Sequence, residues 1–334
     1  MPSFPTPRFP RTRLRRTRRA SWSRRLTRTL SVSVDDLVRP VFVSDSVDGS
    51  QQIDALPGQH RYGLNALTET VGRSADLGIP AVALFPHISP SAKTPDGAEA
   101  HNPDGLVQQA VRQLKRDVPG VAVITDVALD PFTDHGHDGV LDGDRILNDA
   151  TVDQIVRAAL SLVEAGADVI APSDMMDGRI CAVRDALEGA GHTDTLILSY
   201  AAKYASAFYG PYRDAVGTSA ALRGDKRTYQ MDPLRRNVAM REVAMDIEEG
   251  ADMVMVKPGL PYLDVVRDIR ETFDIPVLAY QVSGEYAMIQ AAAERGMIDG
   301  ERVMMESLAS FKRAGCAAVF TYFADEAARR SRKE

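Results

Sequence analysis

Two lysines at the ends of apolar runs are the residues whose type and spacing most directly suggest chemistry. Lys257 closes the run 253–258, and Lys203 follows the run 196–200. A lysine at the end of a buried strand is partly desolvated, and a second ammonium nearby adds like-charge repulsion, so the pKa of at least one amine is lowered. A neutral amine attacks carbonyl carbons. The pair predicts Schiff-base chemistry that holds two carbonyl substrates, although either lysine can instead simply pair with an aspartate.

The segment 203–233, directly after the first of these lysines, is rich in Gly, Pro, Tyr, Ser and Arg and shows little helical period. So long a connection in a compact domain is typical of a lid over an active site. Its cations imply that an anionic group is enclosed, most economically a substrate carboxylate. We expect Arg213 and Lys226 to bind it, and Arg223 and Arg227 to be solvated bystanders.

The elements that must position these residues alternate along the chain. Short apolar, β-branched runs are followed by segments of helical period such as 151–167 and 232–251, which end in Gly-Ala. Eight strand–helix units predict an α/β fold of the (β/α)8 TIM-barrel type. A doubly wound sheet is the alternative, but no GxGxxG follows the first run. The predicted strands are 39–43, 81–85, 121–129, 167–174, 196–200, 253–258, 276–282 and 317–323.

Barrel enzymes place their chemistry at the carboxyl ends of the strands. The reactive residues that we expect at these ends form a short list: Asp126, Ser173, Asp174, Lys203, Lys257, Ser283 and Tyr322.

Composition narrows the class of protein. The 334 residues are 44% apolar, enough for a large core, and no apolar run is long enough to span a membrane. The only cysteines, Cys181 and Cys316, have no CxxC partner, which excludes a disulfide framework and a structural thiolate zinc site. We expect a soluble cytoplasmic protein without a membrane partner.

Residues 1–28 form a basic leader with ten arginines and no acidic residue, whereas the rest of the chain holds 30 basic against 46 acidic residues. Composition alone leaves three interpretations open: a transit peptide, a nucleic-acid-binding arm, or an arm that lies on the acidic body of a sister subunit. We expect an extended N-terminal arm over residues 1–34 and a catalytic barrel over residues 35–334.

Five long motifs resemble those of the porphobilinogen synthase (5-aminolevulinate dehydratase) family. They are APSDMMDGR (171–179), LSYAAKYASAFYGPYRDA (198–215), GADMVMVKPGLPYLD (250–264), YQVSGEYAM (280–288) and FKRAGCAAVFTYFA (311–324). The resemblance covers nearly the whole chain. It implies the asymmetric condensation of two 5-aminolevulinate molecules to the pyrrole porphobilinogen, with loss of two waters, in tetrapyrrole biosynthesis.

The resemblance also implies roles for individual residues. Lys257 matches the lysine that binds the first substrate, and Lys203 matches the lysine that binds the second. Asp126 and a neutral lysine amine are the candidate bases. The remaining substrate-binding matches are Ser283 and Tyr322 for the first carboxylate, Arg213, Lys226 and Gln230 for the second, and Ser173 at a strand end.

The loop 126–144 contains six aspartates and two histidines. In zinc-dependent members of the family, cysteines occupy the positions of Ala128, Asp130 and Asp138, so no catalytic zinc is expected here. Oxygen ligands suit Mg²⁺ or a monovalent cation. The sequence leaves open whether the loop binds an ion or positions the second substrate's ammonium group and water.

The chain resembles the magnesium-dependent branch of the family. In that branch an allosteric Mg²⁺ lies away from the chemistry, held by one carboxylate that corresponds to Glu242, with Asp174 and Arg179 reached through water. Family members also use an N-terminal arm to build homo-octamers from dimers. This resemblance favours the subunit-contact interpretation of the leader, without a nucleic-acid partner, and predicts that truncation yields smaller assemblies.

Two rival functions remain to be weighed. A class I aldolase needs one lysine imine and usually a phosphate site after strands seven and eight, where this chain has SGEY and TYFA without a Gly-rich anion loop. An RNA-binding protein would use the arginine leader, and its retention on RNA would vanish with residues 1–28.

Overall fold

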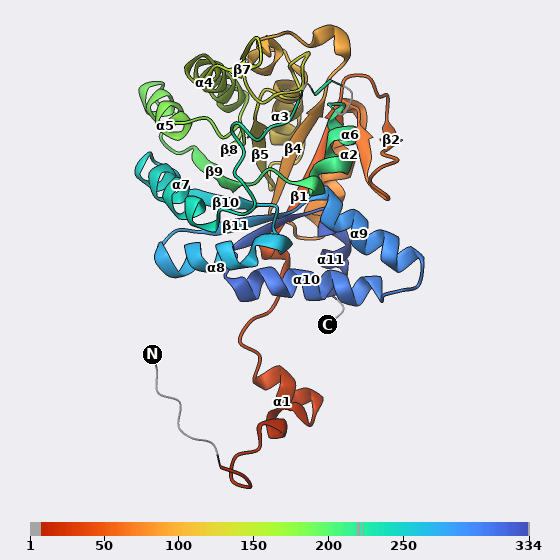
Figure 1. Cartoon of the computed structure of the whole chain (residues 1–334). Coiled ribbons are helices and arrows are strands. Elements are labelled where there is room, and N and C mark those ends of the chain that lie inside the picture. Colours follow the sequence, from red (N-terminus) through yellow and green to blue (C-terminus); the bar gives the residue numbers. More distant parts are fainter. Residues whose placement is uncertain (1–7, 219–220, 223, 333–334) are drawn as a thin grey trace. The chain divides into compact units, whose positions relative to one another are not determined.

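Eight parallel strands form a closed barrel at the centre of the computed structural model, which describes residues 8–218, 221–222 and 224–332 (Figure 1). The barrel closes because the last strand pairs with the first, with Leu37 opposite Val319 and Val38 opposite Phe320. The predicted (β/α)8 TIM barrel is confirmed. Its strands are β1 (Leu37–Ser44), β4 (Ala81–His87), β5 (Ala122–Val127), β8 (Val169–Pro172), β9 (Leu196–Lys203), β10 (Met253–Lys257), β11 (Val277–Gln281) and β12 (Ala318–Thr321).

Helices surround the barrel and lie between successive strands (Figure 1). The two helices expected at 151–167 and 232–251 are α4 and α7, each beginning and ending within a few residues of the predicted bounds. The helices of the outer layer are α2 (Leu64–Asp76), α3 (Leu106–Asp117), α4 (Asn148–Glu164), α5 (Arg179–Gly189), α7 (Arg236–Glu248), α8 (Leu263–Thr272), α9 (Ser283–Glu294), α10 (Gly300–Ala314) and α11 (Ala324–Ser331).

Both faces of the barrel strands are buried, which explains why they read as nearly continuous apolar runs. Val41, Val82 and Leu84 belong to a core cluster that includes buried residues of α2, α3 and α4. The interior is filled largely by aromatic rings: the Phe42 and Phe85 centroids are 6.1 Å apart on neighbouring strands. This packed interior forms the floor of the site.

Strand β9 is longer than its apolar run predicts, because a β-bulge lets it continue to Lys203. Ser199 is opposite Val254 and Ala202 is opposite Val256, so two residues of β9 face one residue of β10 between these pairs. Bulges of this kind re-aim the side chains that follow them.

The lid contains a two-turn helix, α6 (Gly210–Val216), that the sequence did not reveal. Seven residues are too few to show a helical period. The local signals were Pro211 in the first turn and Gly217 beyond the last, with Gly217 in the left-handed conformation at φ 72°. The minor strands are β2 (Ser50–Gln52), β3 (His60–Tyr62), β6 (Leu141–Asp142) and β7 (Arg145–Ile146), and the 3-10 turns are η2 (Val34–Asp36), η3 (Pro90–Ala92), η4 (Ala98–His101), η5 (Ala207–Tyr209) and η6 (Leu260–Tyr262).

The chain divides into two compact units, Met1–Ser31 and Val32–Glu334. The first contains a 3-10 turn, η1 (Leu14–Arg18), and a short helix, α1 (Ser21–Leu26), and exposes Phe9, Leu14, Trp22 and Leu26. In the described part of the chain, every helix is too short or too polar to cross a membrane.

Candidate active site

Lys257 and Lys203 are the last residues of neighbouring strands and are direct partners in the register of β10 and β9. Parallel neighbours lie about 4.8 Å apart, so the stems of the two side chains start side by side. Each lysine is only 5% exposed. Two amines are thus buried together at the carboxyl ends of the strands, as the sequence predicted.

Aromatic rings surround the Lys257 amine. Its Nζ lies 4.7 Å from the ring centroid of Tyr280, 5.0 Å from those of Tyr200 and Tyr212, and 5.7 Å from that of Tyr209. Burial in this setting, followed by the charge of Lys203, lowers the pKa of Lys257 to about 7. A substantial share of this amine is therefore neutral and nucleophilic near neutral pH.

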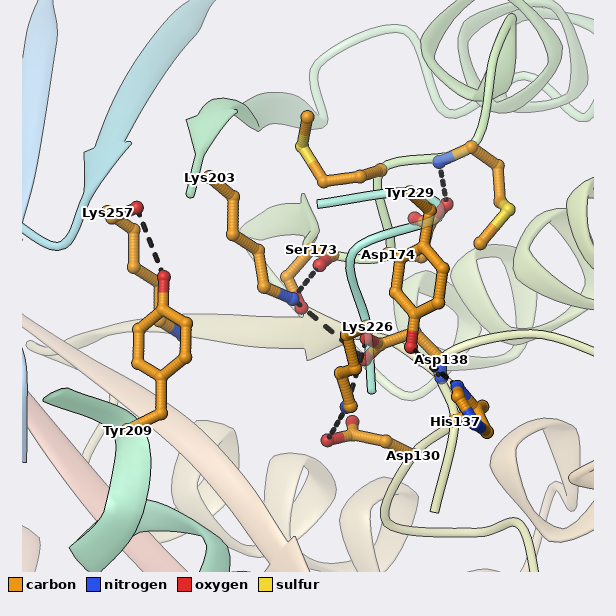
Figure 2. A network of polar contacts seen from close by, with 12 residues as sticks. Asp130, His137, Asp138, Ser173, Asp174, Lys203, Tyr209, Lys226, Tyr229 and Lys257 are labelled. Carbon is orange, nitrogen blue, oxygen red and sulfur yellow. Dashed lines mark hydrogen bonds and ion pairs between the residues drawn. The ribbon is translucent and has the colours of Figure 1, made fainter. Parts of the chain in front are cut away.

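Lys203 lies in a more polar environment than Lys257 (Figure 2). Its ammonium donates a hydrogen bond to the carbonyl oxygen of Ser173, at the end of β8, and lies 3.9 Å from Oδ1 of Asp138. A carbonyl oxygen and a carboxylate thus face this amine, whereas aromatic rings face that of Lys257. The two lysines therefore differ in environment, which suits two substrates handled in different roles.

Asp126, the predicted base, faces both amines from β5. Its Oδ1 is shielded from solvent and has no hydrogen-bond partner among the described residues. Burial raises the pKa of Asp126 to about 6, although the charges of Lys257 and Lys203 act in the opposite direction. A carboxyl group with a pKa near 6 can accept a proton at neutral pH and return it during a reaction.

Most of the predicted substrate-binding residues meet around one cavity. It is lined by Asp130, Ser173, Lys203, Tyr209, Tyr212, Arg213, Lys226, Gln230 and Lys257. Ser283 and Tyr322 are buried but do not line this cavity. Ser283 Oγ accepts a hydrogen bond from the backbone N–H of Tyr212 at 2.9 Å, and the Tyr322 hydroxyl lies 3.0 Å from that of Tyr280. These two residues therefore lie behind the tyrosines, on the Lys257 side.

The lid is fastened to the barrel at both ends. Tyr204 donates its backbone N–H to the carbonyl oxygen of Lys257 at 2.9 Å, and the N–H of Met231 donates to the carbonyl oxygen of Lys203 at 2.9 Å. Arg61 donates to the carbonyl oxygen of Ala215 at 2.8 Å, which anchors the end of α6. Arg227 is exposed and pairs with Asp225, as expected for a bystander, while Arg223 lies outside the described residues.

The amine of Lys226, a lid residue, lies between Asp130 and Asp138 of the loop 126–144, here called the aspartate loop (Figure 2). Its Nζ donates to Asp130 Oδ2 at 3.1 Å and to Asp138 Oδ2 at 3.0 Å. The two histidines of the loop bond to protein groups: His135 Nε2 lies 3.1 Å from the carbonyl oxygen of Pro95, and His137 Nδ1 lies 3.1 Å from the Tyr229 hydroxyl. Among the described residues, no three His, Cys, Asp or Glu side chains gather as a metal site.

Glu242 lies on α7, outside the barrel and apart from the amines. It is half-buried near a fully buried ion-pair network in which Arg179 Nε lies 3.6 Å from Asp174 Oδ2 and Arg179 Nη2 lies 3.4 Å from Asp246 Oδ2. Burial, followed by the charge of Asp246, raises the pKa of Glu242.

Comparison with known proteins places this geometry in a family. Residues 11–330 match the family model described as "ALAD: Delta-aminolevulinic acid dehydratase". The chain is 55% identical over 322 residues to the delta-aminolevulinic acid dehydratase of Bradyrhizobium diazoefficiens, covering 96% of this chain and 91% of the relative. The chain belongs to the delta-aminolevulinic acid dehydratase family. The family resemblance seen in the sequence is confirmed.

Two further relatives support this membership. The delta-aminolevulinic acid dehydratase of Rhodobacter capsulatus is 50% identical, with 97% of this chain and 98% of the relative covered. The crystal structure of the Toxoplasma gondii ME49 dehydratase in complex with the reaction product porphobilinogen superposes with a TM-score of 0.94 at 48% identity, covering 96% of this chain and 91% of that chain. This dehydratase-family chain therefore shares both sequence and fold with a product-bound relative.

The tyrosines around Lys257 were missed when the sequence was considered alone. Tyr200 and Tyr280 lie on β9 and β11, and Tyr209 and Tyr212 flank the start of α6. The available signal was the pair Tyr209 and Tyr212, which follow the candidate catalytic Lys203 by six and nine residues. Only the fold shows that all four rings converge on one amine.

Capture of a carbonyl substrate at Lys257 is expected to increase as pH rises through about 7, because the pKa of this lysine is lowered to about 7 and only the neutral amine attacks. The pKa of Asp126 is raised to about 6, so this carboxyl group loses its proton, and becomes able to act as a base, as the pH rises through about 6. The acid limb of kcat/KM should therefore fall between about pH 6 and 7. Steady-state kinetics from about pH 5 to 9 would check this, and a flat acid limb would contradict it.

Proposed function

We propose that the chain is a porphobilinogen synthase, which condenses two 5-aminolevulinate molecules to porphobilinogen with release of two waters. The observation that carries this proposal is the register-matched pair Lys203 and Lys257, buried together in a dehydratase-family barrel. The enzyme is a lyase of tetrapyrrole biosynthesis. An aldolase would leave the second buried amine without a role.

The chemistry follows from the two environments. The neutral amine of Lys257 adds to the ketone carbon of one substrate, and loss of water gives an iminium ion that the surrounding tyrosine rings stabilise. The iminium acidifies the adjacent C–H. We assign the acceptance of that proton to Asp126, and the resulting enamine attacks the carbon of the second substrate, which is held as an imine on Lys203. A neutral lysine amine is the candidate for the last ring deprotonation.

Carboxylate binding divides between the two sides of the cavity. Ser283 and Tyr322 lie on the Lys257 side and are assigned to the first substrate. Arg213, Lys226 and Gln230 belong to the lid and are assigned to the second. Ser173, whose carbonyl oxygen accepts a hydrogen bond from Lys203, is assigned to substrate positioning.

A thiolate zinc site does not fit this loop. Ala128, Asp130 and Asp138 offer no thiol, and the two cysteines, exposed Cys181 and buried Cys316, lie elsewhere in the chain. We propose instead an allosteric Mg²⁺ held by the Glu242 carboxylate and several waters, with Asp174 and Arg179 reached through water. Burial and neighbouring carboxylates raise the pKa of Glu242, which means that they destabilise its charged form. A bound cation would stabilise that charged form. The ion supplies stimulation from outside the catalytic site.

Chelation of divalent ions is expected to reduce porphobilinogen formation without abolishing it, by about fivefold or more for an ordinary allosteric coupling. Restored Mg²⁺ should recover the rate, and restored Zn²⁺ should not. Glu242→Gln should retain the residual rate and lose the Mg²⁺ response. Turnover of 5-aminolevulinate by the chelated enzyme, with each metal added separately, measures both effects. Rescue by Zn²⁺ with no response to Mg²⁺ would overturn the metal assignment.

We propose that the basic arm contacts another subunit in a homo-octamer built from dimers. Ten arginines and the exposed Phe9, Leu14, Trp22 and Leu26 suit an acidic, partly apolar partner such as the body of a second copy. Removal of residues 1–30 should yield smaller assemblies with low activity, which light scattering and turnover would reveal. A truncated protein that remains a fully active octamer would refute the assignment, and RNA retention that requires the arm would favour the nucleic-acid interpretation.

We propose a cytoplasmic location. The relatives from Physcomitrium patens and Glycine max are named chloroplastic, whereas the name of the Bradyrhizobium diazoefficiens relative carries no such label. Cell fractionation with antibody detection distinguishes the two compartments.

A further inference from the structure

The aspartate loop and the lid meet at a buried group of charges that the proposed reaction does not by itself explain. Asp130, Asp138 and Lys226 are 6%, 1% and 8% exposed, respectively. The ammonium lies between the two carboxylates, at 3.1 and 3.0 Å from their nearest oxygens (Figure 2). The ammonium of Lys226, from the lid, thus contacts both carboxylates of the aspartate loop.

The surrounding backbone fixes all three groups. Thr133 Oγ1 donates to the carbonyl oxygen of His137 at 2.9 Å, which closes the loop between the two aspartates. On the lid side, the N–H of Gln230 donates to the carbonyl oxygen of Lys226 at 2.9 Å. The Tyr229 hydroxyl joins both segments by accepting the N–H of Asp138 at 3.3 Å. The bridge is therefore built into the fold.

Two carboxylates buried this close together repel each other unless a cation balances them. The electrostatics agree: burial and the charge of Asp138 raise the pKa of Asp130, while Lys203 and Lys226 overcome burial and hold that of Asp138 at about 2. An ammonium carries positive charge and donates three hydrogen bonds. Two of these reach the aspartates, and the third remains for a ligand in the cavity that Lys226 lines.

We propose that Lys226 is a built-in cation that takes the place of a metal ion in the aspartate loop, so that removing its ammonium opens a cation site between Asp130 and Asp138. Hard divalent ions prefer carboxylate oxygen and water, the ligands that the vacated position would offer. With the ammonium present, both inner oxygens are already engaged and a divalent ion is repelled by the lysine charge.

The test needs no substrate, so it stands apart from the proposed reaction. Full-length protein is titrated with Mn²⁺, and bound ion is counted by electron paramagnetic resonance. Lys226→Met should bind one more Mn²⁺ per chain than the unmodified protein, and Lys226→Met/Asp138→Asn should lose that extra ion. Lys226→Arg keeps the positive charge and should gain none. Lys312→Met, at an ion pair with Asp36 outside the cavity, is the control for general effects.

Two results would overturn the proposal. One is Mn²⁺ binding by the unmodified protein that falls when Asp138→Asn is introduced. The other is a folded Lys226→Met protein that gains no ion. Where Lys226→Met fails to fold, adding Asp138→Asn should restore folding, because it removes one of the two repelling charges. Failure of that rescue, while Asp138→Asn alone folds, would also count against the built-in cation.

Discussion

Lys257→Met is expected to lower the rate of porphobilinogen formation by at least about 10⁴-fold, the scale on which loss of a covalent nucleophile acts. Methionine keeps the length and apolar character of the stem, so the tyrosine surroundings remain filled. What disappears is the amine whose pKa is lowered to about 7 and which captures the first ketone. Turnover by the purified variant measures the loss directly.

Borohydride trapping separates loss of the nucleophile from a general defect. Reduction in the presence of labelled 5-aminolevulinate should label Lys257 in the unmodified protein and leave that position unlabelled in the variant. Lys312→Met, which removes a lysine remote from the barrel mouth, should retain both turnover and labelling. Porphobilinogen formation at an ordinary rate by Lys257→Met would exclude the Schiff-base mechanism on this residue.

Lys203→Met is the second substitution with a large expected effect, a loss of at least about 10³-fold in porphobilinogen formation. The substitution removes the amine that holds the second ketone and leaves the carbonyl oxygen of Ser173 without this donor, whereas Asp138 keeps its ion pair with Lys226. The Lys257 amine also loses its neighbouring positive charge, so its pKa should rise.

The two lysine variants should differ in what they can still trap. Lys203→Met retains Lys257 and should still form one reducible imine per chain, although more slowly near neutral pH because more of the remaining amine is protonated. Peptide mapping after borohydride reduction identifies the labelled residue. Label that fails to appear on Lys257 in this variant, with the protein folded, would mean that the amines do not capture their substrates independently.

The sequence was sufficient to place the strands and the residues at their ends. Each of the eight apolar runs is a barrel strand, because strands buried on both faces leave an uninterrupted signal. Lys257, Asp126 and Tyr322 could be assigned to the barrel mouth from this pattern alone.

Contacts across the site could not be predicted in the same way. The bridge from Lys226 to Asp130 and Asp138 depends on how the lid folds back over a loop nearly ninety positions earlier. The tyrosines around Lys257 come from two strands and the lid, and no local sequence pattern predicts that their rings lie around one amine. The burial of Arg179 beneath the outer helices was hidden for the same reason, since a charged residue is usually exposed.

The direction in which the Lys203 side chain points depends on the one extra residue in the bulge of β9. Ser199 faces the outer helices, where it contacts Asp246, whereas Tyr200 faces the Lys257 amine inside. The extra residue between Ser199 and Ala202 restores the inward direction at Lys203 and brings it opposite Lys257. If the same residues ran on without the bulge, Ala202 would lie opposite Lys257 and the side chain of Lys203 would turn toward the helices. A one-codon insertion between Ala202 and Lys203 would therefore move the second amine away from Lys257 while leaving both lysine codons intact.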